Sequence, residues 1–303
     1  MHVLVTGGTG FVGSYLTGML CARDDKITIV SRRPDHVRTA RAGVKAVEWL
    51  PDLSKFDAVV HLAGEPIFGK RWSAVQKRNL RSSRIASTKK IVAALANADP
   101  KPKAFVCASA IGYYGDRPGE ELTEDSRPGT DFLAQLCVDW EQTARAAEAD
   151  AGVRTVCVRT GVVLGPDGGA LKKMLRPFRM FVGGPLGSGR QSFSWIHEED
   201  LARLIEFAID EPEVRGPLNA TSPRVVTMKE FARTLGRVLH RPALCPAPGF
   251  ALRLALGEVA TVLVADQRVI PARALAAGFE FKHAELEPAL TDLLQRYLLA
   301  PRA

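Results

Sequence analysis

A glycine-rich turn near the start of the chain constrains the fold more than any other feature. Residues 2–20 read HVLVTGGTGFVGSYLTGML, so Gly7, Gly10 and Gly13 follow a short apolar run and open a helical stretch. In that setting Gly7 permits a tight turn, Gly10 lets the backbone approach a pyrophosphate, and Gly13 lets the helix pack close to the strand. The helix N-terminus adds N–H groups and a partial positive charge. An ordinary turn is the alternative, but the strand–turn–helix context favours a dinucleotide cradle.

Short apolar runs rich in β-branched residues alternate with longer amphipathic stretches along the first half of the chain. The predicted strands are 2–6, 26–31, 44–49, 57–63, 103–109 and 154–160. The predicted helices among them are 13–23, 73–97 and 132–150. Continuous rather than alternating apolar runs are typical of strands buried on both faces, and helical crossovers make such strands parallel. The sequence therefore predicts an α/β fold with a Rossmann-type doubly wound parallel sheet.

The sequence changes in character after about residue 165. Stretches such as GPDGGALKKMLRPF, GGPLGSGRQ and RPALCPAPG are rich in Gly and Pro and predict loops. Helices are expected again at 199–210, 227–239, 250–264 and 284–299. We therefore expect a nucleotide-binding Rossmann domain over 1–165, to which segments around 190–222 return. A smaller, mostly helical substrate region is expected over 166–303.

Composition and cysteine usage narrow the class of protein. The 303 residues are 46% hydrophobic and 24% charged, as in ordinary globular proteins. No apolar run reaches the ~18 residues of a membrane span, and the N-terminus lacks the pattern of a signal peptide. We therefore expect a cytoplasmic protein with no membrane partner. The five cysteines are widely separated, so they predict buried thiols rather than disulfides, and no metal site is expected.

The net charge of +8 raises the question of a nucleic-acid partner. The basic residues are spread out, and the densest run, 70–90, predicts a helix with one solvated basic face. A basic face alone is a weak nucleic-acid footprint, so no such partner is expected. An anionic small molecule is the favoured ligand.

The end of the second predicted strand distinguishes the two nicotinamide dinucleotides. NAD sites usually carry an acidic residue there for the ribose 2′-hydroxyl. Here the strand ends in Ser31, Arg32 and Arg33. A guanidinium can fork onto a 2′-phosphate and stack on adenine. The sequence thus favours NADP(H), the alternative being that both arginines are only solvated loop residues.

Several motifs together resemble one superfamily. TGGTGFVG, HLAGEP, SAIGYYG and FSWIHEEDLA are similar to the extended short-chain dehydrogenase/reductases. The stretches at 62–67, 83–88, 136–141, 159–171 and 183–200 resemble its atypical NADP-dependent, sugar-nucleotide epimerase-like branch, whose members are sometimes labelled cell-division inhibitors. The segment 243–291, which contains AGFEFKHAELEPAL, resembles the small C-terminal domain of that branch. The resemblance covers almost the whole chain.

The resemblance also implies where the cofactor lies. It places the phosphates on the glycine loop and Ser31–Arg32, the adenine near 50–53, and the nicotinamide ribose near Ala63 and Gly64. The cofactor-binding residues implied in this way are Thr6, Gly7, Gly10, Phe11, Val12, Gly13, Ser31, Arg32, Leu50, Pro51, Asp52, Leu53, Ala63, Gly64, Glu65, Arg71 and Thr160. Glu65 has the alternative of being a solvated loop acid.

The catalytic pair typical of the superfamily is missing from this chain. Its members usually combine a Ser or Thr with Tyr-x-x-x-Lys, whose lysine lowers the pKa of the tyrosine. Ser109, at the end of the fifth predicted strand, fits the serine role. With Glu141 as the acid that follows the pair, Leu133 stands at the tyrosine position and Cys137 at the lysine position. No Tyr-x-x-x-Lys occurs anywhere in the sequence.

Three interpretations of this absence stay open. Another acid or base serves, Tyr114 being the first candidate and Tyr113 the second. Alternatively, hydride transfer needs little proton assistance, or the protein binds NADP(H) without chemistry. Cys137 is either a thiol acid/base or, because its neighbours are apolar, a core residue. His197 either points into the substrate cleft or packs beneath it.

The leading hypothesis is an NADP(H)-binding oxidoreductase or epimerase-like protein with an unidentified small-molecule substrate. Ser109 and Tyr114 are its candidate catalytic residues. The main alternative is a catalytically inactive NADPH-binding sensor or scaffold. The superfamily often dimerises through two helices, here 73–97 and 132–150, but the polar face of 70–90 leaves a monomer equally open.

Overall fold

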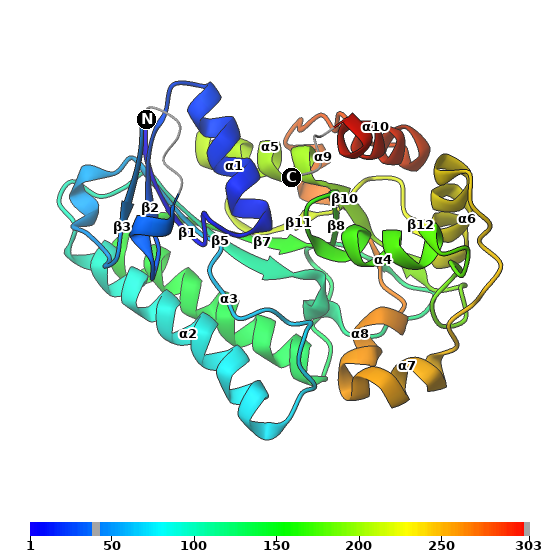
Figure 1. The fold of residues 1–303 in the computed structure, drawn as a ribbon. Coiled ribbons are helices and arrows are strands. Elements are labelled where there is room, and N and C mark those ends of the chain that lie inside the picture. Colours follow the sequence, from blue (N-terminus) through cyan, green and yellow to red (C-terminus); the bar gives the residue numbers. More distant parts are fainter. Residues whose placement is uncertain (38–42, 300–303) are drawn as a thin grey trace.

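A seven-stranded sheet forms the centre of the molecule, in a computed structural model that describes residues 1–37 and 43–299 (Figure 1). The strand order is β11-β7-β5-β4-β1-β2-β3, and every neighbouring pair is parallel. The strands are β1 (His2–Thr6), β2 (Lys26–Val30), β3 (Val44–Val47), β4 (Ala58–His61), β5 (Ala104–Ala110), β7 (Arg154–Thr160) and β11 (Gly216–Ala220). The strand order runs outward in both directions from β1 and β4, which confirms the predicted doubly wound sheet.

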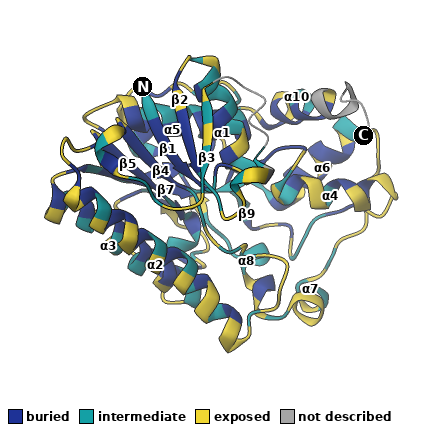
Figure 2. Ribbon diagram, turned by 60° about the vertical axis from the view of Figure 1, so that its left-hand side comes forward, coloured by how far each residue is buried: buried dark blue, intermediate teal, exposed yellow. Residues whose placement is uncertain are grey.

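Helices cover both faces of this sheet (Figure 1). Helices α1 (Phe11–Ala22) and α5 (Glu198–Asp210) pack on one face, and α2 (Ala74–Asn97) and α3 (Phe132–Ala151) on the other. Along β1, Val3 and Val5 belong to the α1–α5 core, whereas Leu4 belongs to the α2–α3 core. Alternate side chains therefore enter opposite cores, which is why the strand reads as a continuous apolar run. Figure 2 shows buried strands and exposed outer faces on α2 and α3.

The remaining residues build a smaller region beside the sheet. Its helices are α4 (Gly169–Arg179), α6 (Met228–Leu239), α7 (Gly249–Leu256), α8 (Ala260–Val264), α9 (Ala272–Ala276) and α10 (Leu286–Leu299). Its short strand pairs are β8 (Val162–Leu164) with β10 (Trp195–His197), β9 (Ser192–Phe193) with β12 (Val226–Thr227), and β6 (Glu121–Leu122) with β13 (Arg268–Val269). Helices α4, α6 and α10 share a third core. Within the described ranges, no helix has the length and apolar character needed to cross a membrane.

Two expectations about this region were wrong. The loop expected after residue 165 contains helix α4, because Leu171, Leu175 and Phe178 recur at helical spacing and bury one face despite Pro177 near its end. The single helix expected over 250–264 is interrupted at Gly257, whose φ of +67° ends α7. At α4 the apolar periodicity determines the structure despite the Gly and Pro residues. At Gly257 the glycine ends the helix despite the apolar periodicity.

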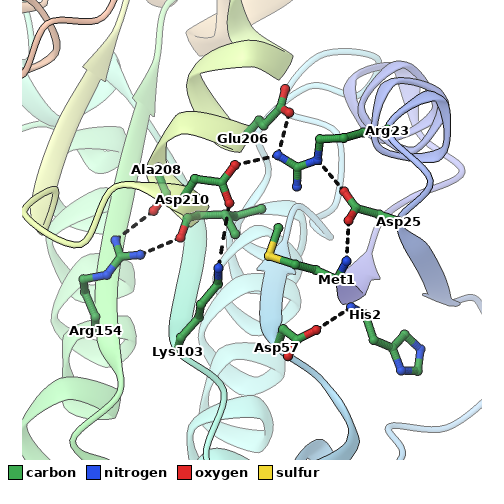
Figure 3. Close-up of polar contacts among 11 residues, drawn as sticks. Met1, His2, Arg23, Asp25, Asp57, Lys103, Arg154, Glu206, Ala208 and Asp210 are labelled. Atoms are coloured by element: carbon green, nitrogen blue, oxygen red, sulfur yellow. Dashed lines mark hydrogen bonds and ion pairs between the residues drawn. The ribbon is translucent and has the colours of Figure 1, made fainter.

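An ion-pair network joins α1 to α5 at the amino ends of the strands (Figure 3). The Arg23 guanidinium lies 2.6 Å from Asp25, 2.6 Å from Glu206 and 2.5 Å from Asp210. Ligands of doubly wound sheets bind at the opposite, carboxyl edge. We therefore regard this network as structural.

Candidate cofactor and substrate site

The glycine loop lies at the carboxyl end of β1 and has the geometry of a phosphate cradle. Gly7 has φ +73°, and a Cβ there would lie 2.8 Å from the Ala63 amide nitrogen. A Cβ on Gly13 would lie 2.2 Å from the Gly7 carbonyl oxygen, so only glycine allows this helix–strand contact. A Cβ on Gly10 would meet only the Gly7 oxygen, at 3.2 Å, and Gly10 is exposed. No side chain caps α1, and its first turn has no acid. Its N-terminal amides therefore suit an anionic ligand.

Phe11 packs this loop against the segment after β8. Cβ atoms on Gly165, Gly168 and Gly169 would lie 2.5, 2.4 and 3.0 Å from the Phe11 ring. Thr6 and Val12, also predicted to bind the cofactor, make contacts inside the protein. Thr6 is buried and shares a 2.6 Å hydrogen bond with His61, and Val12 packs against the α1–α5 core.

Ser31 and Arg32 lie at the end of β2, beside the cradle, as the sequence predicts for the adenosine end of a dinucleotide. The Arg32 side chain is exposed, and the Ser31 hydroxyl accepts from the Arg33 amide at 3.2 Å. The pKa of Glu65, in the loop after β4, is lowered by its 3.1 Å contact with Lys70 and also by the charge of Arg32. Arg32 and Glu65 therefore lie close enough to interact across the mouth of the site.

The residues expected near the adenine, 50–53, differ in how far they are buried and in what their side chains contact. Leu53 is a core residue, and Asp52 accepts hydrogen bonds from the amide and hydroxyl of Ser54, which lower the pKa of its carboxyl. Leu50 and Pro51 are half-buried. The Leu50 side chain packs against the α2–α3 core, so of these four residues Pro51 alone is committed neither to the core nor to a cap.

Arg71, also predicted to contact the cofactor, lies in the loop after β4 and binds a neighbouring helix. Its guanidinium donates to the carbonyls of Leu254 and Ala255, at 2.5 and 3.1 Å, and so ties the loop after β4 to α7. Both bonds use Nη2 of the guanidinium, and the cofactor contact of Arg71 stays a prediction. Thr160 lies half-buried at the end of β7, as expected for the mouth of the site.

Arg84 on α2 is a candidate site residue that the sequence analysis did not identify. It is 9% exposed, and its one hydrogen bond among the described residues is to the Leu80 carbonyl, at 3.3 Å. No carboxylate of the described residues pairs with it, although a guanidinium has five N–H donors. A Cβ on Gly64 would lie 3.2 Å from its Cζ. Burial lowers the pKa of Arg84, and the nearby Cys137 and Glu65 offset this only in part, so a buried cation lies directly behind the loop expected at the nicotinamide ribose.

A buried polar network lies under the ends of β5 and β7. The Ser109 hydroxyl donates to Glu141 at 2.6 Å, and Arg159 forks onto the same carboxylate with two bonds of 2.8 Å. Arg159 also donates to the Tyr114 oxygen at 2.9 Å, and Tyr114 donates to Asn219 at 2.7 Å. Burial alone would lower the pKa of Arg159, but its bonds to Glu141 raise it overall. The network thus holds a permanent ion pair beside Ser109.

The surroundings of Tyr114 argue against the assignment of this residue as acid or base. Tyr114 is fully buried, and burial raises the pKa of its hydroxyl to about 12. Its hydroxyl already donates one hydrogen bond and accepts another. Tyr113 is the better placed of the two, because it is half-buried, with its ring centroid 3.4 Å from the Arg159 guanidinium carbon.

Cys137 and His197 pack inside the protein. Burial, followed by the charge of Glu141, raises the pKa of the Cys137 thiol to about 12, so the thiol is not ionised. His197 is fully buried and stacks on His283 at 3.7 Å. These positions favour the structural interpretation of both residues over a catalytic one.

His197, His283 and Asp292 each offer an atom within 4.8 Å of the others, as metal ligands would. However, Nδ1 of His197 accepts from the Glu199 amide at 3.0 Å, so the proton of the neutral ring lies on Nε2, 3.3 Å from Asp292. A metal at Nε2 would require the opposite tautomer. The geometry therefore fits a close contact between the His197 ring and the Asp292 carboxylate of α10 better than a metal site.

Sequence profiles of two known families match this chain. The NAD dependent epimerase/dehydratase family matches residues 3–220, and a domain of unknown function, DUF1731, matches residues 247–293. Together these matches cover the sheet region and most of the C-terminal region.

Individual relatives match over nearly the full length. The chloroplastic epimerase family protein SDR39U1 homolog of Arabidopsis thaliana is 43% identical, over 97% of this chain and 87% of its own. The epimerase family protein YfhF of Bacillus subtilis is 40% identical, over 97% and 98%. A crystal structure of human epimerase family protein SDR39U1 (isoform 2) with NADPH is similar with a TM-score of 0.88 and 38% identity, covering 97% of this chain and 99% of that one.

Proposed function

The chain belongs to the NAD dependent epimerase/dehydratase family, as an atypical extended short-chain dehydrogenase/reductase of the SDR39U1 type, and we propose from that premise that it is an NADP(H)-dependent oxidoreductase or epimerase. Its proposed substrate is a small molecule. The similarity to the human protein crystallised with NADPH supports this cofactor.

One observation carries the proposal: the uncapped N-terminus of α1 with the open side of Gly10 beside it. The Gly10 amide donates to the Gly7 carbonyl at 2.9 Å, so the backbone amides of 11–13 would hold the pyrophosphate. Arg32 at the end of β2 holds the 2′-phosphate, because its guanidinium is exposed and no acid occupies the strand end. The same arrangement would leave a 2′-hydroxyl without the carboxylate partner that NAD sites provide.

We assign the nicotinamide end to Arg84. The cofactor supplies hydride chemistry when bound, and the buried Arg84 guanidinium would hold its ribose hydroxyls through donors that the protein itself leaves largely unused. This cation lies close enough to Cys137, at the lysine position of the family pattern, for the two to influence each other's pKa. Arg84 can therefore supply the positive charge that the missing lysine supplies elsewhere.

Ser109 and Tyr113 are the residues we assign to the substrate. The Ser109 hydroxyl donates its hydrogen bond to Glu141, which leaves its oxygen lone pairs to accept one from a substrate hydroxyl. Tyr113 is half-buried, and its ring stacks on the Arg159 guanidinium, which fixes the position of the ring after β5. A serine that accepts a hydrogen bond and a fixed tyrosine hydroxyl nearby suit the positioning of a substrate alcohol.

The alternative of an inactive NADPH-binding sensor is supported by one observation. The three positions most expected to move a proton hold Leu133, a buried Cys137 and a buried Tyr114. On this alternative the protein would bind NADPH and present a changed surface to a partner, without turnover.

The experiment that separates the two is a panel of aldehydes, ketones, alcohols and nucleotide sugars assayed with NADPH or NADP+, alongside a cofactor titration. Turnover that falls in Ser109→Ala and Tyr113→Phe, with cofactor affinity unchanged, would support the enzyme. Saturable NADPH binding without turnover across the panel would support the sensor. A protein that binds neither cofactor would contradict both.

A further inference from the structure

The positive charge of the chain is concentrated on two segments that the proposed function does not use as a unit. Segments 168–190 and 240–257 contain seven Lys and Arg residues and no Asp or Glu, so the rest of the chain is nearly neutral. The segments lie side by side. The Cys245 amide donates to the Gly183 carbonyl at 3.1 Å, and the Ala247 amide donates to the Pro185 carbonyl at 2.9 Å. The two therefore form one surface.

Helix α4 gives this surface a basic stripe. Its buried residues pack into the third core. Lys172, Arg176 and Arg179 are exposed and, at spacings of four and three residues, share the opposite face. The helix is thus amphipathic, with a cationic outer side that leads to its C-terminal end.

Exposed apolar side chains follow at that end. Met180, Phe181 and Val182 are 62%, 57% and 53% exposed, and Leu244 on the adjacent segment is 83% exposed. Phe181 has φ +62°, a left-handed backbone that bulky residues rarely adopt. The Arg241 guanidinium carbon lies 4.6 Å from the Phe181 ring centroid. We call these four apolar residues, with Arg176, Arg179 and Arg241, the basic apolar tip.

We propose that the basic apolar tip docks the protein onto an anionic lipid bilayer. Basic residues around protruding apolar side chains match anionic headgroups above an acyl boundary. A second copy meeting this surface with its own would place like charges opposite each other. A helical peptide partner would require a groove, whereas these side chains project outward. The proposed contact is peripheral, so no segment of the chain crosses the bilayer. It departs from the expectation of no membrane partner, which rested on the lack of an apolar run long enough to span a membrane.

Co-sedimentation with vesicles tests the proposal. The purified protein is mixed with vesicles of equal parts phosphatidylglycerol and phosphatidylcholine, or of phosphatidylcholine alone, at ~0.15 M salt. We expect at least ~tenfold stronger binding to the anionic vesicles, weakening as salt rises. Phe181→Gly should lose at least ~tenfold of this binding while keeping NADPH affinity and thermal stability, because glycine adopts a positive φ without strain.

Charge reversal supplies a matched control. R176E with R179E changes the same charge as K89E with K90E, two exposed lysines on α2. Only the first pair should abolish binding to anionic vesicles. Equal losses in both pairs, equal binding to both vesicle types, or no binding at all would overturn the proposal. Retention on poly-glutamate together with no vesicle preference would instead indicate an acidic protein partner and would overturn it too.

Discussion

Replacing Gly10 by Val should abolish cofactor binding without unfolding the protein. Gly10 has φ −77° and ψ 174°, an extended conformation that any residue adopts. A Cβ there touches only the Gly7 carbonyl oxygen, at 3.2 Å, and the rest of the side chain projects into the exposed cradle. The substitution therefore fills space that the free protein does not use and that the proposed pyrophosphate needs.

The expected loss of folding stability in Gly10→Val is smaller than the expected loss of cofactor affinity. Loss of a glycine N-cap to an apolar residue costs the fold at most about 1 kcal/mol. Excluding the phosphates removes at least two amide–phosphate hydrogen bonds, each worth about 1.5–3 kcal/mol because the acceptor is charged. The affinity for NADPH should therefore fall by at least about two decades, since 1.4 kcal/mol is tenfold.

Gly13→Ala is the matched control, because its main effect should be on folding stability, whereas the main effect of Gly10→Val should be on cofactor affinity. Its Cβ would lie 2.2 Å from the Gly7 oxygen and 2.7 Å from Gly8 Cα, backbone atoms that cannot move aside. We expect it to lose on the order of 1–3 kcal/mol or more of folding stability. Calorimetric titration with NADPH and denaturant unfolding measure the two quantities. Unchanged NADPH affinity in Gly10→Val would refute the cradle.

Four further substitutions test the interior of the site. Once a substrate is found, Ser109→Ala should lower kcat by on the order of 10²-fold, and Cys137→Ser should lower it by a smaller factor. A larger loss of kcat in Cys137→Ser than in Ser109→Ala, measured in steady-state assays, would make Cys137 the catalytic residue instead of Ser109. Glu141→Gln leaves the Arg159 cation buried without its partner and should cost about 3–5 kcal/mol in denaturant unfolding, so wild-type stability in that variant would show that the pair is not needed. Burial, with the charge of Arg84, lowers the pKa of His61 to about 4. Neutral His61 therefore contributes stability above about pH 6.5 that is lost as pH falls towards 4, and His61→Gln should remove this part of the pH dependence; parallel stability curves for the two proteins would contradict the assignment.

The sheet was predictable from sequence because its strands contribute apolar side chains to the cores on both faces. Val3, Leu4 and Val5 alternate between the α1–α5 and α2–α3 cores, so β1 shows an unbroken apolar run. The glycine turn was predictable for a similar reason, since its close contacts tolerate few residue types. Helix α4 was not predicted, because local Gly and Pro signals outweighed a burial pattern that depends on a distant core.

The site was only partly predictable, because the roles of polar residues depend on partners far apart in sequence. Tyr114 follows the strand that ends near Ser109, but its hydroxyl is bound by Arg159 and Asn219, which lie in other strands. Arg84 carried a signal that could have been noticed: a charged residue on the buried face of α2, four residues from both Leu80 and Thr88. A charge at a core position of a helix deserved a functional explanation.

The relative affinity for NADPH and NADH tests the central claim most directly. A 2′-phosphate bound by the exposed Arg32 should be worth about 1.5–3 kcal/mol, or one to two decades of affinity. Parallel titrations of the wild-type protein should therefore give at least tenfold tighter binding of NADPH. The ratio should fall as salt is raised, because an exposed charge pair is screened. Arg32→Ala should lose this preference and leave NADH binding nearly unchanged. Equal affinities of the wild-type protein for the two cofactors, or equal losses for both in Arg32→Ala, would contradict the account.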